Sequence, residues 1–179
     1  FSCFVWNWNN NVELAKLIKQ KWPDCLIVFG GWQVPMSDRI AGFFKEHPYV
    51  DIAVHGEGEI TFAKILQENL KDYPEWESVL GCSIPYTMLS NKRLKNRTVT
   101  NGLVVKEEFD NPGYKLLDTY TNLPRPRIKD LASMPSPYLD GVFDNLVKDC
   151  DHQLEATFET TRGCPYACTY CEIGTKYYQ

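Results

Sequence analysis

"CLIVFGG" (residues 25–31) is the stretch of sequence that decides the fold. Residues 26–29 form an apolar run rich in branched side chains, and two glycines end the run. A short apolar run bounded by turn residues is typical of a strand buried on both faces. Glycine permits positive φ angles and a close approach of the backbone to a ligand, so the turn after the strand is a candidate binding site.

The same pattern recurs on both sides of this strand. Further strands are predicted at residues 1–6 ("FSCFVW"), 50–59 ("VDIAVHGEGE") and 78–86 ("SVLGCSIPY"). Helices are predicted between them at residues 9–22, 37–47 and 61–73. Strands that alternate with helices predict an α/β domain with a Rossmann-like parallel sheet, covered by helices on both faces. Ligands of such sheets bind at the carboxyl ends of the strands.

Apolar side chains at helical spacing define the face that each helix is expected to bury. The expected core positions are Leu14, Ala15, Leu17, Ile18 and Trp22 in the first helix, Ile40, Phe43 and Phe44 in the second, and Phe62, Ile65, Leu66 and Leu70 in the third. Asn10 or Asn11 is expected to cap the first helix and Ser37 the second, since short polar side chains accept bonds from free backbone N–H groups.

The character of the sequence changes after residue 86. Asn101-Gly102 lies between strand-like flanks in residues 98–109 and predicts a β-hairpin. Residues 122–141 hold four prolines, as a linker would, and residues 154–164 are again strand-like. We therefore predict a first domain at 1–86, a hairpin and proline-rich connector at 87–150, and a second domain that starts at 151 and is incomplete at 179.

Composition narrows the functional classes. The chain is 44% hydrophobic and 13% aromatic, which favours a packed core, and its net charge of −4 gives a nucleic-acid partner no support. The sequence contains no run of about 18 uncharged apolar residues, so no membrane span is predicted, and no signal peptide is visible. We expect a cytoplasmic protein without a membrane partner. Both ends resemble cut ends, so an internal piece of a longer protein is expected.

Three of the seven cysteines, Cys164, Cys168 and Cys171, have the spacing C-x3-C-x2-C. Three thiolates on one loop can converge on a metal centre. A structural zinc site needs four ligands, and Cys150, His152 or a ligand in a missing part of the protein could complete the set. A [4Fe–4S] cluster is ordinarily held by four thiolates, so three would leave one iron open. The other cysteines in apolar runs, Cys3, Cys25 and Cys82, are expected to be core residues.

"ETTRGCPYACTYCEIG" (159–174) resembles the cluster-binding loop of radical S-adenosylmethionine (SAM) enzymes, including the aromatic Tyr170 before the third cysteine. The resemblance implies that the three cysteines bind a [4Fe–4S] cluster and that its open iron binds SAM. It also implies reductive cleavage of SAM to a 5′-deoxyadenosyl radical, with Tyr170 near the adenine. The strand at 154–164 would be the first strand of a partial (β/α) barrel.

The first domain resembles the cobalamin-binding domain that precedes many radical SAM barrels. The resemblance rests on "FSC" at 1–3, on the paired glycines and on "GEGE" at 56–59. It implies cobalamin contacts by Ser2, Gly30, Gly31, Gly56, Glu57, Gly58 and Glu59. The family's optional Asp-x-His-x-x-Gly segment, which supplies a cobalt ligand, would lie upstream. None of His47, His55 and His152 stands in that motif, and turn packing is expected for His55.

The combined resemblance implies a radical SAM enzyme with cobalamin as second cofactor. Methyl transfer is the reaction expected first, and another radical transformation, such as a rearrangement or ring chemistry, is the alternative within this class. The implied partners are a small-molecule or natural-product substrate and an external electron donor such as flavodoxin or ferredoxin. No catalytic side chain is assigned, and the piece alone is expected to be inactive. The alternative is a zinc-binding regulatory or interaction module on a Rossmann-like domain.

Overall fold

A computed structural model describes residues 1–36, 39–89, 97–100, 103–107, 114–116, 119–166 and 168–171. The chain divides into two compact units, Phe1–Pro126 and Arg127–Gln179, and each is described by itself. The predicted domain boundaries after residues 86 and 150 stay predictions. No helix in the described part of the chain is long and apolar enough to cross a membrane.

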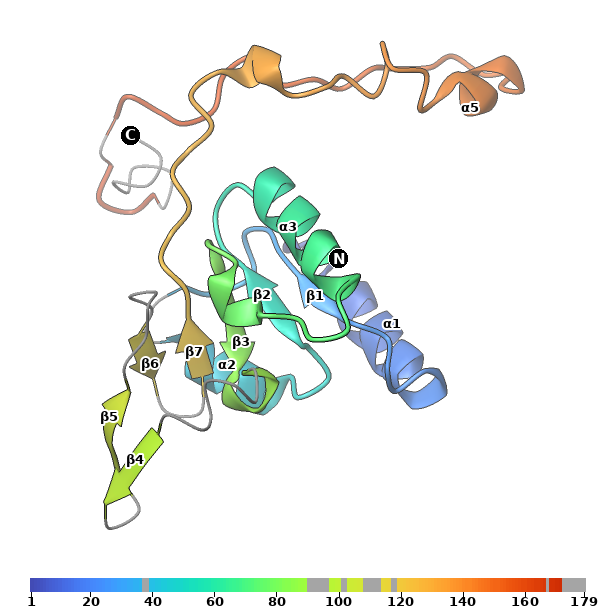
Figure 1. Ribbon diagram of the computed structural model, residues 1–179. Helices are drawn as coiled ribbons and strands as arrows, with labels where there is room; N and C mark the ends of the chain where they lie inside the picture. Colours follow the sequence, from blue (N-terminus) through green and yellow to red (C-terminus); the bar gives the residue numbers. More distant parts are fainter. Residues whose placement is uncertain are drawn as a thin grey trace. The chain divides into compact units, whose positions relative to one another are not determined.

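The first unit contains a five-stranded sheet flanked by helices (Figure 1). Its helices are α1 (Trp8–Lys21), α2 (Ile40–Glu46) and α3 (Glu59–Asn69), with short 3-10 turns η2 (Trp76–Ser78) and η3 (Tyr86–Met88). Its strands are β1 (Val28–Phe29), β2 (Ile52–Val54), β3 (Cys82–Pro85), β4 (Arg97–Thr100), β5 (Leu103–Glu107), β6 (Tyr114–Leu116) and β7 (Thr119–Thr121). The sheet has the order β1-β2-β3-β7-β6, while β4 and β5 pair with each other.

The α/β class is confirmed, but the prediction of a parallel sheet is wrong beyond β2. β1 and β2 are parallel, whereas β3 is antiparallel to β2, with Val54 opposite Cys82. Residues 70–81 carry the chain from the end of α3 back to the carboxyl end of β2, where the N–H of His55 donates to the carbonyl of Gly81. β3 therefore starts where β2 ends, and β7 and β6 extend the sheet by antiparallel pairing.

Residues 1–6 do not form the full strand that was predicted. Only one parallel bridge joins them to β1, between Ser2 and Gly30. The side-chain oxygen of Asn7 accepts from the backbone N–H of Phe4, which closes a turn and ends the extended segment. Asn7 also stands at the N-cap position of α1, so the predicted caps Asn10 and Asn11 are wrong. Ser37 lies outside the described residues.

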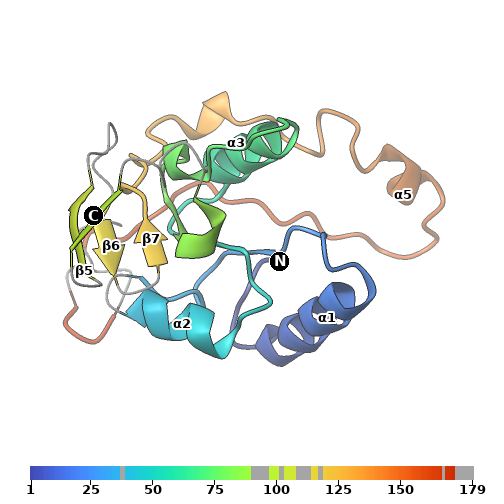
Figure 2. The same cartoon turned by 60° about the horizontal axis from the view of Figure 1, so that its bottom comes forward.

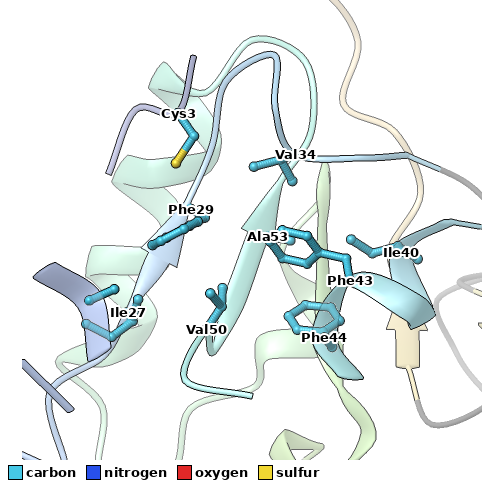
Figure 3. Close-up of a cluster of buried hydrophobic side chains, with 10 residues drawn as sticks. Cys3, Ile27, Phe29, Val34, Ile40, Phe43, Phe44, Val50 and Ala53 are labelled. Carbon is cyan, nitrogen blue, oxygen red and sulfur yellow. The ribbon is translucent and has the colours of Figure 1, made fainter. Parts of the chain in front are cut away.

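Two hydrophobic clusters fill the two faces of the sheet. Neighbouring residues of a strand point to opposite faces, so Phe29 and Ala53 join one cluster while Val28 and Ile52 join the other. The first cluster includes side chains of α1 and α2 and is drawn in Figure 3. The second includes Ile65 of α3, and Figure 2 shows α3 on the opposite side of the sheet from α1 and α2.

The buried helix faces are narrower than the sequence predicts. In α2 the predicted Ile40, Phe43 and Phe44 are all buried. Ala15 is the fully buried residue of α1, and Ile18 is partly buried, but Leu14, Leu17 and Trp22 are exposed. In α3, Ile65 is buried while Phe62, Leu66 and Leu70 are exposed. A sheet whose strands are two to four residues long covers only a narrow stripe of each helix.

The antiparallel pairing of β4 with β5 confirms the predicted hairpin strands, with Thr100 opposite Leu103. The turn residues Asn101 and Gly102 lie outside the described residues.

The second unit contains η4 (Leu131–Ser133) and α5 (Asp144–Lys148). The strand predicted at residues 154–164 is absent, because no described segment pairs with it. A strand needs a neighbour to satisfy its N–H and C=O groups. Here the Tyr138 hydroxyl accepts from the N–H of Thr157 and donates to its carbonyl instead. The start of a radical SAM barrel therefore stays a prediction.

Candidate functional site

Three of the predicted ligand loops meet at the carboxyl ends of β1 and β2. Cys3 donates its backbone N–H to the carbonyl of Gly30 at 2.6 Å. A Cβ added to Gly30 would lie 3.5 Å from Cβ of Val54, and one added to Gly58 would lie 3.7 Å from Cγ1 of Val54. The structure thus brings together residues 1–3, the Gly30-Gly31 turn and the turn at 56–58 around the end of β2.

The Gly30-Gly31 turn needs glycine at its second position. Gly31 has a φ of +95°, and a Cβ there would lie 2.7 Å from the carbonyl oxygen of Cys3. The same carbonyl accepts from the N–H of Gln33 at 3.1 Å. The turn after β1 is therefore held tightly against residues 1–3, and a side chain at Gly31 would push the two loops apart.

The Gly56–Gly58 turn leads directly into helix α3. Gly56 has a φ of +67°, and Gly58 stands at the N-cap position, where its carbonyl accepts from the N–H of Phe62 at 2.7 Å. Glu59 is exposed in the first turn of α3, where a carboxylate complements the positive end of the helix dipole. Glu57, between the two glycines, is half-buried.

Two asparagines fix the backbone around Ser2. The side-chain amides of Asn7 and Asn11 both donate to the carbonyl of Ser2, at 2.9 and 3.1 Å. Ser2 itself is exposed. Asn11 was predicted only as a helix cap, and Asn7 was assigned no individual role, although residues 7–11 follow the first predicted strand, where ligands of such sheets are expected.

His55 has a more specific environment than turn packing. Its Nε2 lies 2.7 Å from Oγ of Ser83, which in turn lies 2.9 Å from Oγ1 of Thr121. Its Nδ1 is buried and has no hydrogen-bond partner among the described residues. Burial lowers the pKa of His55 to about 4, so the imidazole is neutral at neutral pH. A neutral ring has one N–H and one bare nitrogen.

The three clustered cysteines lie on one loop of the second unit. Cys168 is exposed, Cys164 and Cys171 are half-buried, and the N–H of Cys171 donates to the carbonyl of Cys168 at 3.1 Å. Across the described ranges, no group of three or more His, Cys, Asp or Glu side chains is close enough to hold a metal ion. The structure places the predicted ligands on one turn but does not bring their thiols together.

The entry to the cysteine loop is anchored by arginine. Nη2 of Arg127 donates to the carbonyl of Arg162 at 2.9 Å, and Nε of Arg162 pairs with Glu159 at 2.7 Å. Gly163, with a φ of +101°, then turns the chain into Cys164. Tyr170 is 90% exposed. Its ring therefore does not pack beneath the loop and is available to a ligand.

The remaining cysteines differ from the clustered ones. Cys3 and Cys82 are buried, as predicted, whereas Cys25 is exposed and its assignment to the core is wrong. Burial raises the pKa of the Cys3 thiol and raises that of Cys82 to about 12, so both stay protonated at neutral pH. A metal ligand must be a thiolate, which leaves the loop cysteines as the better donors.

Comparison with known proteins identifies relatives of the chain. No protein-family model matches it. It is 38% identical over 177 residues, 97% of its length, to the cobalamin-dependent radical SAM methyltransferase TokK of Streptomyces tokunonensis. It matches equally well a 2-(S-pantetheinyl)-carbapenam-3-carboxylate methyltransferase of Streptantibioticus cattleyicolor. An uncharacterized methyltransferase of Pyrococcus horikoshii is 29% identical over 164 residues.

The chain spans about a fifth of the length of its first two relatives, 21% in each case. Because the match covers 97% of the chain, it includes the glycine loops of the first unit as well as the cysteine loop of the second. The resemblance predicted from the sequence is therefore confirmed: over nearly its whole length, this chain is related to cobalamin-dependent radical SAM methyltransferases.

Proposed function

We propose that the protein is a methyltransferase that uses a [4Fe–4S] cluster, SAM and cobalamin. The observation that carries the proposal is the 38% identity over 97% of the chain to a cobalamin-dependent radical SAM methyltransferase. Two features of the chain support it: two glycine-bearing loops at the carboxyl ends of the parallel strands β1 and β2, and three cysteines on one loop.

The residues of the first unit fit a cobalamin site. Gly30, Gly31 and Gly58 let the three loops approach one another, and the backbone of Ser2 is fixed by two amides. Nδ1 of His55, which is buried and has no hydrogen-bond partner within the described ranges, adds a polar group at the end of β2 that a ligand can satisfy. In this proposal Ser2, the glycine pair and the 56–59 turn hold the cofactor.

The residues of the cysteine loop fit an iron–sulfur cluster through the chemistry of their donors. Thiolates are the usual ligands of such clusters, and Cys164, Cys168 and Cys171 supply three of them. When bound, the cluster supplies the electron that cleaves SAM, and cobalamin supplies a carrier for the methyl group. Arg127 and Arg162 hold the entry of the loop, and the exposed ring of Tyr170 is available to the adenine of SAM.

The methyl acceptor that we propose is a small molecule or natural product. The proposal also includes an external protein that donates electrons, such as flavodoxin or ferredoxin. The relatives are named as methyltransferases, which supports methyl transfer as the reaction. We assign no described residue of this chain to substrate binding.

Anaerobic reconstitution of the full-length protein tests the proposal. We expect a brown protein with about four irons per chain, cleavage of SAM after reduction, and retention of cobalamin on desalting. Cys168→Ala should abolish SAM cleavage and leave cobalamin binding unchanged. Colourless protein with stoichiometric zinc would instead support the zinc-binding module and overturn the proposed function.

A further inference from the structure

The imidazole of His55 is a buried polar group with only one of its two nitrogens in use. Nε2 is 2.7 Å from the hydroxyl of Ser83, while Nδ1 is shielded from solvent without a partner among the described residues. Buried side-chain polar atoms nearly always have a hydrogen-bond partner, and an exception needs an explanation such as a missing ligand. Nδ1 of His55 is therefore a candidate ligand contact.

Hydroxyl groups of two neighbouring strands hold the ring. Ser83 of β3 and Thr121 of β7 are directly opposite each other and are joined by a 2.9 Å hydrogen bond. Both are buried, on a sheet whose other interior side chains are largely apolar. Nε2 of His55 continues this chain of hydroxyls, so the ring has one fixed orientation and Nδ1 one fixed position.

The position of His55 in the chain ties Nδ1 to the candidate site. His55 follows Val54, whose side chain faces the positions that a Cβ on Gly30 or Gly58 would take, and precedes Gly56 with its positive φ. Its backbone N–H is bonded to the carbonyl of Gly81, so the residue is fixed at the carboxyl end of β2. Because burial keeps the ring neutral, Nδ1 binds as a neutral hydrogen-bonding atom.

We propose that Nδ1 of His55 hydrogen-bonds a side-chain amide of the corrin ring of cobalamin. The inference rests on the proposed function, because it assigns a residue to the same site. An amide both donates and accepts, so it can satisfy Nδ1 in either tautomer of the ring. The role is that of a positioning contact at the edge of the cofactor, and cobalt is not its target.

Three variants of the full-length protein distinguish the contribution of Nδ1 of His55 from that of Nε2. The amide of asparagine places a polar atom near the position of Nδ1, and that of glutamine places one near Nε2. His55→Asn keeps the proposed contact and loses the bond to Ser83, while His55→Gln does the reverse. Ser83→Ala, the matched control, removes the hydroxyl and leaves the imidazole in place.

Equilibrium binding of hydroxocobalamin to each variant is measured by titration, with the visible absorption of the cofactor as the readout. We expect His55→Gln to weaken binding by about tenfold, the effect of one lost hydrogen bond, while His55→Asn and Ser83→Ala stay within about threefold of the wild type. Equal affinity of all three variants would overturn the inference and leave the proposed function standing. A wild type that binds no cobalamin would overturn both.

A second readout uses the wild type and so does not depend on the folding of any variant. Hydrogen exchange at C2 of the His55 ring, measured by mass spectrometry, should slow on addition of hydroxocobalamin, while exchange at His152 stays unchanged. His152 is the matched control because its side chain is exposed. An unchanged rate at His55 in a protein that binds cobalamin would contradict a contact at Nδ1. A cobalt–nitrogen signature that is lost in His55→Gln would also overturn the positioning role.

Discussion

The carbonyl oxygen of Cys3 lies where a side chain on Gly31 would begin: a Cβ on Gly31 would be 2.7 Å from it. Non-glycine residues also pay a conformational cost at the φ of +95° that Gly31 adopts. We predict that Gly31→Ala destabilises the protein by about 2–3 kcal/mol. Urea unfolding followed by circular dichroism measures the change.

Gly30→Ala is the matched control for this prediction. A Cβ at Gly30 would lie 3.5 Å from Cβ of Val54, which is an ordinary van der Waals distance. We expect a loss of stability below about 1 kcal/mol. Equal losses for the two alanine variants would show that the contact with Cys3 does not distinguish the two glycines.

A second prediction concerns Thr61, a fully buried polar residue of α3. Its hydroxyl donates to the carbonyl of Leu80 at 3.1 Å and accepts from Nε of Arg125 at 2.8 Å. Thr61→Val keeps the shape but leaves both partners with one bond fewer, so we expect a loss of about 1–3 kcal/mol. Thr61→Ser retains the hydroxyl and should lose less than half as much. A neutral Thr61→Val would contradict the role of this bond.

The third prediction follows from the burial of His55. Its pKa is about 4 in the folded protein, below the ordinary value of 6.5, so the unfolded chain binds a proton first as the pH falls. The stability that the neutral ring provides is complete above pH 6.5 and is lost between pH 6.5 and about 4. The expected loss is about 2–4 kcal/mol.

Urea unfolding at pH 7.5 and pH 4.5 measures this loss in the wild type and in His55→Asn. The wild type should lose more stability than the variant, and the difference isolates His55. Such a comparison is needed because burial also lowers the pKa of His47, which acts in the same direction. Parallel pH dependence in the two proteins would show that His55 does not titrate with folding.

The sequence predicted α1, α2 and α3 and the positions of β1, β2 and β3 well, because each has a local pattern of apolar residues, whereas α5 was not predicted. The direction of β3 is not a local property. A buried strand reads the same in either direction, and the antiparallel pairing of Val54 with Cys82 results from the course of residues 70–81. The prediction of the buried helix faces was partly wrong for a related reason. Leu17 and Leu66 have the right spacing for a buried face, but both are exposed because the narrow sheet does not reach them.

In the candidate site, too, the features with a local sequence pattern were predicted and those that depend on distant residues were not. Gly31 and Gly56 were predicted from turn patterns, and both adopt positive φ. The hydrogen bond of His55 was missed because its partner, Ser83, is 28 positions further along the chain and meets it only through sheet pairing. Ser83 in turn bonds Thr121, which is 66 positions after His55. The described residues do not bring the three cysteine thiols together, and their spacing remains the evidence for their role.

The last prediction tests the cysteine loop against a cysteine that serves as an internal control. Cys25 and Cys168 are both exposed, whereas Cys3 and Cys82 are buried with raised thiol pKa values. Since the thiolate is the reactive form, a brief pulse of iodoacetamide should label Cys25 and Cys168 in the metal-free protein and spare Cys3 and Cys82. Peptide mass spectrometry identifies the labelled sites.

Reconstitution with iron and sulfide should then change the pattern at one of these two positions. Cys168 should become protected by at least about tenfold because an iron-bound thiolate is no longer a free nucleophile, while Cys25 should react at its former rate. Cys164 and Cys171 should be protected together with Cys168, because in the proposed site all three bind the same cluster. Continued labelling of Cys168 in brown, iron-loaded protein would mean that other side chains hold the iron, and the ligand assignment would be wrong.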